Sequence, residues 1–198
     1  MSFFDDNKKV GLALIIIGIV GIVIALVRIV VAFDHTNTTA NVIIAVGALI
    51  FGVLILLFGL NTRKGSNDKV AILSGLFRVL GIGTIISGIC GAIGTAIIVG
   101  VGTGIVSGVL DILFGLILLW ASFKVAGGNK NVIGKILWIL LVIIFLILAI
   151  LAIVGFFAVF AGTLILVLEG INSICWFFVY VYALIATLSP EVKKSMGV

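Results

Sequence analysis

Long apolar runs alternate with short basic segments along this chain. Six of the runs can each cross a bilayer, because a spanning helix needs about 20 apolar residues at a rise of about 1.5 Å per residue. The runs are continuous, whereas a transmembrane β-barrel would show segments of about ten residues that alternate apolar and polar side chains. The pattern predicts an all-α, polytopic membrane protein, with one transmembrane domain over residues 1–198. The six expected helices cover residues 10–33, 40–60, 70–91, 96–123, 132–154 and 160–188.

The basic residues indicate how the helices are oriented in the bilayer. Ten of the 12 Lys and Arg residues lie at the two termini, between the second and third runs, and between the fourth and fifth runs. Lys and Arg are enriched in cytoplasmic segments, so we expect both termini to be cytoplasmic and the protein to lie in the cell membrane. These ten residues are Lys8, Lys9, Arg63, Lys64, Lys69, Lys124, Lys130, Lys135, Lys193 and Lys194.

A repeat divides the chain into hairpins. Residues 52–60 recur as residues 108–116 with seven of nine positions identical, at an offset of 56 residues. Residues 167–173 form a fainter third copy. Each unit is expected to be a pair of helices joined by a short outer turn, and the three units share one orientation, which makes them parallel repeats. The predicted hairpins cover approximately residues 8–62, 67–124 and 130–189.

The composition identifies lipid as the main solvent of the chain. It is 64% hydrophobic and 10% charged, and a soluble domain of 198 residues could not bury that much apolar surface. A net charge of +5 would suggest nucleic acid as the partner of a soluble protein. Here the positive excess follows from the membrane topology, so we expect membrane lipid and no nucleic acid as a partner. The first apolar run, Val10–Val27, is too long for a cleavable signal peptide.

Four ionisable residues interrupt the apolar runs: Arg28, Arg78, Asp111 and Glu169. A charge at the centre of the bilayer costs about 2.5–3.5 kcal/mol even on the most lenient scale, so each requires a reason. Counted from the nearest polar or aromatic boundary, Arg78 and Asp111 are at the same depth, and Glu169 is the repeat equivalent of Asp111. We therefore expect these three side chains to form one intramembrane cluster.

Two interpretations of this cluster remain open. In the first, Arg78 and Asp111 form an ion pair that fixes the packing of the helices, and Glu169 joins it or stays protonated. In the second, the three residues form a relay or binding site for a proton, a cation or a small polar solute. Arg28 is farther out and is expected to reach the outer headgroups or to pair with Asp34.

Other chemistry is sparse in the sequence. Asn37 begins an Asn-Thr-Thr glycosylation sequon in the expected first outer turn. The single histidine, His35, lies in the same turn, so a Ser–His dyad inside the membrane is not available. Cys90 and Cys175 lie within apolar runs and are expected to be packing residues. No group of residues has the spacing of a metal site, and we expect no cofactor, no metal and no enzymatic activity.

The segments Ser107–Ile112 and Leu166–Ile171, together with the plan of three hairpins, resemble the HdeD family of six-span membrane proteins linked to acid resistance. The resemblance covers most of the chain. It implies an integral protein of the cell envelope with a stress-related role, and it transfers no catalytic residues.

Two function hypotheses follow. The leading one is a non-enzymatic, HdeD-like membrane protein with a structural, envelope-stress or complex-assembly role, as a homo-oligomer or as a subunit of a membrane complex. The alternative is a small transporter or channel for a proton, a cation or a small polar solute, which uses the intramembrane charges. The two differ in whether these charges face a wet cavity or are sealed by their neighbours.

Overall fold

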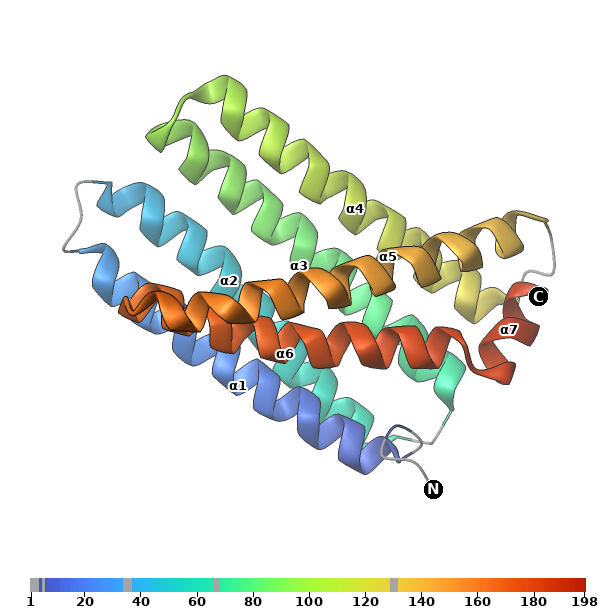
Figure 1. The fold of residues 1–198 in the computed structure, drawn as a ribbon. Helices are drawn as coiled ribbons and strands as arrows, with labels where there is room; N and C mark the ends of the chain where they lie inside the picture. Colours follow the sequence, from blue (N-terminus) through green and yellow to red (C-terminus); the bar gives the residue numbers. More distant parts are fainter. Residues whose placement is uncertain (1–3, 5, 34–36, 66–67, 129–131) are drawn as a thin grey trace.

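Within the residues that the structure describes, the fold is built from seven α-helices, six of which are long and apolar enough to cross a membrane (Figure 1). The computed structural model describes residues 4, 6–33, 37–65, 68–128 and 132–198, and no strand occurs among them. The prediction of an all-α, multi-pass membrane protein is confirmed. The elements are α1 (Asn7–Ala32), α2 (Thr38–Lys64), α3 (Lys69–Ile98), α4 (Val101–Gly127), α5 (Val132–Phe156), the short 3₁₀-helix η2 (Phe157–Ala161), α6 (Leu164–Thr187) and α7 (Pro190–Met196).

Polar residues cap several helix ends. The Asp6 side chain accepts a hydrogen bond from the backbone of Lys8 at the start of α1, and Asp68 accepts one from Val70 at the start of α3, both at 2.9 Å. These carboxylates satisfy amides that have no partner within the helix. At the end of α4, Gly128 adopts a left-handed conformation with φ of 63°, which favours glycine.

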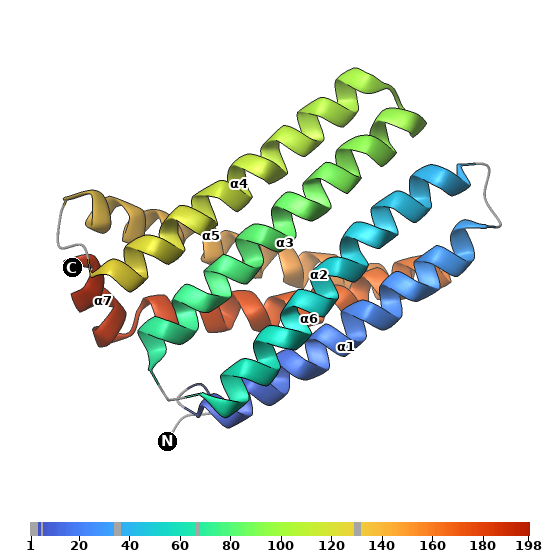
Figure 2. The same cartoon turned by 180° about the vertical axis from the view of Figure 1, so that it is seen from behind.

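The six long helices form two layers. Helices α1, α2, α3 and α4 lie side by side in chain order, and α5 and α6 cross one face of this four-helix layer (Figures 1 and 2). The third hairpin therefore packs differently from the first two: it lies across the layer and does not extend it. Helix α7 folds back at the end of the bundle, where Lys193 lies over the Trp138 ring at 5.4 Å.

Glycines bring the helices of the first two hairpins into close contact. A Cβ atom placed on Gly18 of α1 would lie 2.6 Å from the Leu56 backbone nitrogen of α2, and one placed on Gly81 of α3 would lie 2.7 Å from the Gly115 backbone oxygen of α4. In a membrane, helices associate largely through such packing, because lipid tails are as apolar as the helices themselves. Both copies of the repeated segment use their glycines in this way, since Gly59 lies equally close to α1.

The helix ends differ from the predicted ones in two outer turns. The expected helices 70–91 and 96–123 imply an outer turn near residues 91–94, but α3 continues to Ile98, and the chain turns at Val99 and Gly100. Gly94 serves packing, because a Cβ atom there would lie 2.5 Å from the Ile44 side chain of α2. The expected helices 132–154 and 160–188 imply the next outer turn near residues 155–157, whereas η2 occupies residues 157–161 and α6 begins only at Leu164.

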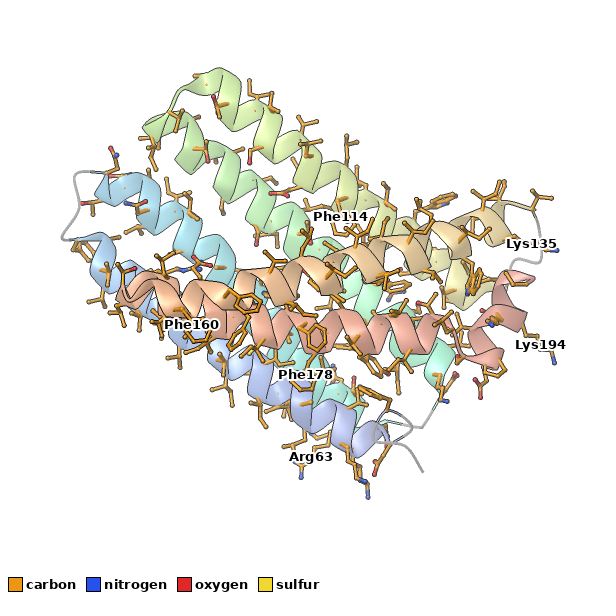
Figure 3. All side chains as sticks on the ribbon, viewed as in Figure 1. Arg63, Phe114, Lys135, Phe160, Phe178 and Lys194 are labelled. Carbon is orange, nitrogen blue, oxygen red and sulfur yellow. The ribbon has the colours of Figure 1, made fainter. Side chains whose placement is uncertain are left out.

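Basic residues gather at one end of the helix bundle, in agreement with the charge pattern of the sequence. Figure 3 shows Arg63, Lys135 and Lys194 at the end of the helices where the termini lie, and Phe160 at the opposite end. Six crossings return the chain to the side on which it started. The end that carries Arg63 is called the basic end below, and the other the apolar end. The cytoplasmic location of the basic end remains a prediction.

Candidate functional site

An ion pair joins α1 to α6 within the spanning segments. Arg28 Nη2 donates a hydrogen bond to Glu169 Oε1, and the two residues are 141 positions apart in the chain. Both lie toward the apolar end, because Arg28 is four residues before the end of α1 and Glu169 is five residues after the start of α6. The Arg28 side chain is 23% exposed and that of Glu169 is 44% exposed, so the carboxylate faces outward more than the guanidinium does.

A cavity of about 260 Å³ lies between the four-helix layer and the α5–α6 pair. Residues of all six spanning helices line it, and apolar side chains predominate. Its polar lining includes Arg28 from α1, Thr84 and Ser87 from α3, and Asn172 from α6. Ser87 donates a hydrogen bond of 3.4 Å to the Gly47 carbonyl of α2. Of the described residues that line the cavity, Arg28 is the one that carries a charge.

Aromatic side chains form a continuous wall of this cavity. The Phe51 ring lies 5.0 Å from Trp176, the Trp176 ring 5.7 Å from Tyr180, and the Tyr180 ring 6.4 Å from Phe145. All four rings belong to the lining. Phe114 from α4 completes the aromatic part of the lining. A pocket with apolar walls and a few polar groups is typical of a small-molecule site.

A groove lies next to the cavity, toward the apolar end. Its lining includes Glu169, Asn41 and Arg28, together with apolar residues of α1 and α2, and its volume is about 360 Å³. Arg28 is part of both linings, whereas Glu169 lines the groove alone. The ion pair therefore stands between the groove and the cavity.

Arg78 does not join this site. Its side chain is exposed on α3, and its guanidinium lies 5.6 Å from the centre of the Phe123 ring of α4. A cation over an aromatic face is stabilised by the quadrupole of the ring. The side chain therefore has an interaction within its own hairpin that the sequence reading did not anticipate.

Asp111 lies at another depth. It is exposed on α4, and its Cβ atom would be 2.6 Å from a Cβ atom placed on Gly88 of α3. Gly88 is ten residues from Arg78, which is about 15 Å along the helix axis. The expected Arg78–Asp111 ion pair is therefore corrected: the two residues share a hairpin but not a level.

The expected cluster fails for a geometric reason. Depth was counted from Lys69 for Arg78 and from Trp120 for Asp111, but α4 continues seven residues past Trp120, to Gly127. Glu169 was also placed with Asp111 through the repeat, although α6 crosses the layer in a way that α4 does not (Figure 1). Glu169 consequently meets Arg28. The alternative partner of Arg28, Asp34, lies outside the described residues.

The remaining sequence candidates lie away from the cavity. Asn37 is exposed at the start of α2, and its glycosylation stays a prediction. Cys90 and Cys175 are free thiols and partly buried, and Cys90 packs against Gly47. In the part of the chain that the structure describes, no group of three His, Cys, Asp or Glu residues could hold a metal ion.

Comparison of the chain with protein-family models, with curated proteins and with solved structures finds no match. The resemblance to the HdeD family therefore stays a prediction, and the site has to be interpreted from its own chemistry.

Sequence reasoning missed the uncharged polar residues of the cavity. Thr84 and Ser87 are three positions apart and so share one face of α3, and Asn172 lies three residues beyond Glu169 on α6. An amide and two hydroxyls inside long apolar runs are a usable signal, because each requires a polar partner within the bilayer. The sequence analysis considered only the four ionisable residues, so these uncharged polar residues were not predicted.

Proposed function

We propose that this integral membrane protein is a non-enzymatic transporter, which binds a small solute in the cavity and passes it across the bilayer. The observation that carries the proposal is a cavity of about 260 Å³ lined by all six spanning helices. Packing alone favours filling such a space with apolar side chains, because interiors are close-packed and empty space forfeits dispersion energy. Polar groups around an intramembrane space are typical of a solute path.

The ion pair supports passage as well as binding. Arg28 separates the cavity from the groove at the apolar end, and its hydrogen bond to Glu169 ties α1 to α6 at that level. Movement of either side chain would connect the two spaces. The Glu169 side chain is 44% exposed and lines the groove, so we infer that the pair acts as a gate at the apolar side of the solute site.

The structural, envelope-stress or complex-assembly role expected of an HdeD-like membrane protein remains the competing prediction. That role requires helix packing and exposed surface, but it does not require a water-accessible cavity. The two functions therefore differ in a measurable property, which is whether water reaches the polar residues of the cavity.

Cysteine accessibility tests this property. In a background that carries Cys90→Ala and Cys175→Ala, Asn172→Cys places a thiol in the cavity, and Ile174→Cys places one on the exposed outer face of the same helix. A charged, membrane-impermeant methanethiosulfonate reagent is added to either side of reconstituted vesicles. Only a hydrated thiol ionises and reacts. We expect reaction at position 172 from both sides and none at position 174.

The outcomes separate the functions. A thiol at position 172 that is as inert as the one at position 174 would mean a dry cavity and would refute the proposal. Reaction from one side alone would keep a solute site and remove passage. A second variant, Ala48→Phe, fills the cavity and should block the reaction, while Val53→Phe on the exposed face of α2 serves as its matched control.

A further inference from the structure

We propose that the solute is an organic anion: a molecule with one ring-sized apolar body and one carboxylate or sulfonate group, which binds Arg28 inside the cavity. The inference rests on the proposed function and specifies its substrate class. Of the proton, cation or small polar solute that the sequence suggested, it selects a solute with a negative charge, because Arg28 lines the cavity and Glu169 does not.

The first argument is the charge of the cavity. Arg28 lines it, whereas Glu169, the partner of Arg28, lines only the groove. The other two intramembrane charges lie elsewhere, with Arg78 over Phe123 and Asp111 beside Gly88. A solute in the cavity therefore meets one cationic group and no carboxylate among the described lining residues. The guanidinium attracts an anion in the cavity, and the low-dielectric surroundings strengthen this attraction when Glu169 moves away and no longer neutralises the charge.

The second argument is the supply of hydrogen-bond donors. A guanidinium has five N–H groups in a planar fork, and one hydrogen bond, to Glu169, is found for Arg28 within the described part of the chain. The Asn172 amide and the Thr84 hydroxyl can donate from α6 and α3 into the same space. Ionised carboxylates and sulfonates only accept, and arginine binds such planar or tripodal oxygens with two parallel bonds.

The third argument is the shape of the remaining space. A cavity of about 150 Å³ lined by apolar side chains holds one benzene molecule. The cavity found here, at about 260 Å³, has room for such a ring and for one polar group of a few atoms. The wall formed by Phe51, Trp176 and Tyr180 offers aromatic faces and edges to the ring.

Glu169 then acts as a competitor for Arg28. The carboxylate of the chain and the acidic group of the solute seek the same guanidinium, so a bound solute displaces Glu169 toward the groove that it already lines. This competition predicts whether one substitution strengthens or weakens the binding of the anion. Glu169→Gln removes the competing charge and should tighten binding of the anion, whereas a simple structural ion pair gives no reason for tighter binding.

The experiment uses three probes of nearly equal size. Benzenesulfonate is a permanent anion, benzenesulfonamide is its neutral counterpart, and phenyltrimethylammonium is a permanent cation. Their binding to the purified full-length protein is measured by titration calorimetry in detergent, with empty micelles as the blank. We expect benzenesulfonate to bind at least about tenfold more tightly than the neutral probe, as one charge-assisted hydrogen bond implies. No binding of the cation is expected.

Two variants with matched controls test the residues. Arg28→Gln should abolish the preference for benzenesulfonate, while Arg78→Gln, the same charge change outside the cavity, should leave it intact. Glu169→Gln should raise the affinity for benzenesulfonate, and Asp111→Asn should not. If Arg28→Gln does not fold, the preference of the unmodified protein and the Glu169→Gln result still decide the matter.

The failures of the two proposals are distinguishable. Three results would overturn the assignment of an anion while keeping the solute site. They are equal binding of all three probes, tighter binding of the cation, and no binding of any probe although position 172 is accessible to water. An unchanged or weaker affinity in Glu169→Gln would overturn the competition. An inert thiol at position 172 would remove the proposed function itself.

Discussion

Replacement of Gly18 by alanine is expected to destabilise the first hairpin, because backbone atoms of α2 occupy the space that the methyl group needs. The added Cβ atom would lie 2.6 Å from the Leu56 nitrogen and 2.7 Å from the Leu56 Cα atom. Ordinary contacts begin near 3.4 Å, so α1 and α2 must separate by about 0.8 Å. A gap of about 0.5–1 Å forfeits a quarter to a half of the dispersion energy of the atoms along it.

The expected loss of unfolding free energy is about 1–3 kcal/mol, the usual range for extra atoms forced into a well-packed interior. Two other glycines of the same fold calibrate it. Gly91 of α3 has nothing within 4 Å of the added atom, so Gly91→Ala should be neutral or slightly stabilising. At Gly75 the added atom meets the tip of the Phe58 ring at 2.7 Å, and a ring can rotate away at a smaller cost than a backbone can move.

The assay is equilibrium unfolding in mixed micelles of a mild detergent and dodecyl sulfate, followed by tryptophan fluorescence. Trp176 is a suitable reporter because its ring packs against Phe51, across the two layers. We expect stability to fall in the order Gly91→Ala, Gly75→Ala, Gly18→Ala. A substitution on the surface usually changes the free energy of unfolding by no more than about 0.5 kcal/mol. If the free energies of unfolding of Gly18→Ala and Gly91→Ala differ by no more than this, the close approach of α1 and α2 is refuted.

Three further predictions concern stability. The double variant Arg78→Gln with Asp111→Asn should lose the sum of the two single losses, within about 0.5 kcal/mol, because the residues lie at different levels; a larger coupling in the same assay would mean that they interact. Trp138→Phe should lower the unfolding free energy by about 0.5–1.5 kcal/mol, since its Nε1 donates a 2.8 Å hydrogen bond to the Thr187 carbonyl, and an unchanged value would argue against that bond. Asp68→Ala should cost about 1 kcal/mol through the lost cap of α3, which melting in detergent would detect and Asp68→Asn should largely prevent.

The spanning helices could be predicted from the sequence because their cause is local. A run such as Val132–Phe156 contains one charged residue and is long enough for the bilayer, and backbone groups in lipid have to be satisfied within the segment. The ends of the helices were less certain. Gly91 and Gly94 were interpreted as a turn, although both lie within α3 and Gly94 packs against α2. A glycine in an apolar run can mark a turn or a close approach, and the sequence does not separate the two.

The candidate site could be predicted only in part, because its cause is not local. The sequence identified Arg28 and Glu169 as intramembrane charges that need partners, but their pairing depends on the angle at which α6 crosses α1. The repeat suggested that Glu169 should behave like Asp111. The third hairpin lies across the layer, and this difference in packing, which two similar segments do not reveal, changes the partner.

The crossing of the third hairpin also explains why a cavity exists at all. Within the four-helix layer, neighbouring helices approach each other closely at glycines, as at Gly18 against Leu56 and Gly81 against Gly115. Across the layers the contacts are aromatic, as between Phe51 and Trp176, and large rings hold α6 away from the layer. The hydroxyl of Thr84, which would be costly against lipid, faces the space that results. The same residues that separate the layers thus create a place in which a polar group, and with it a solute, can reside within the bilayer.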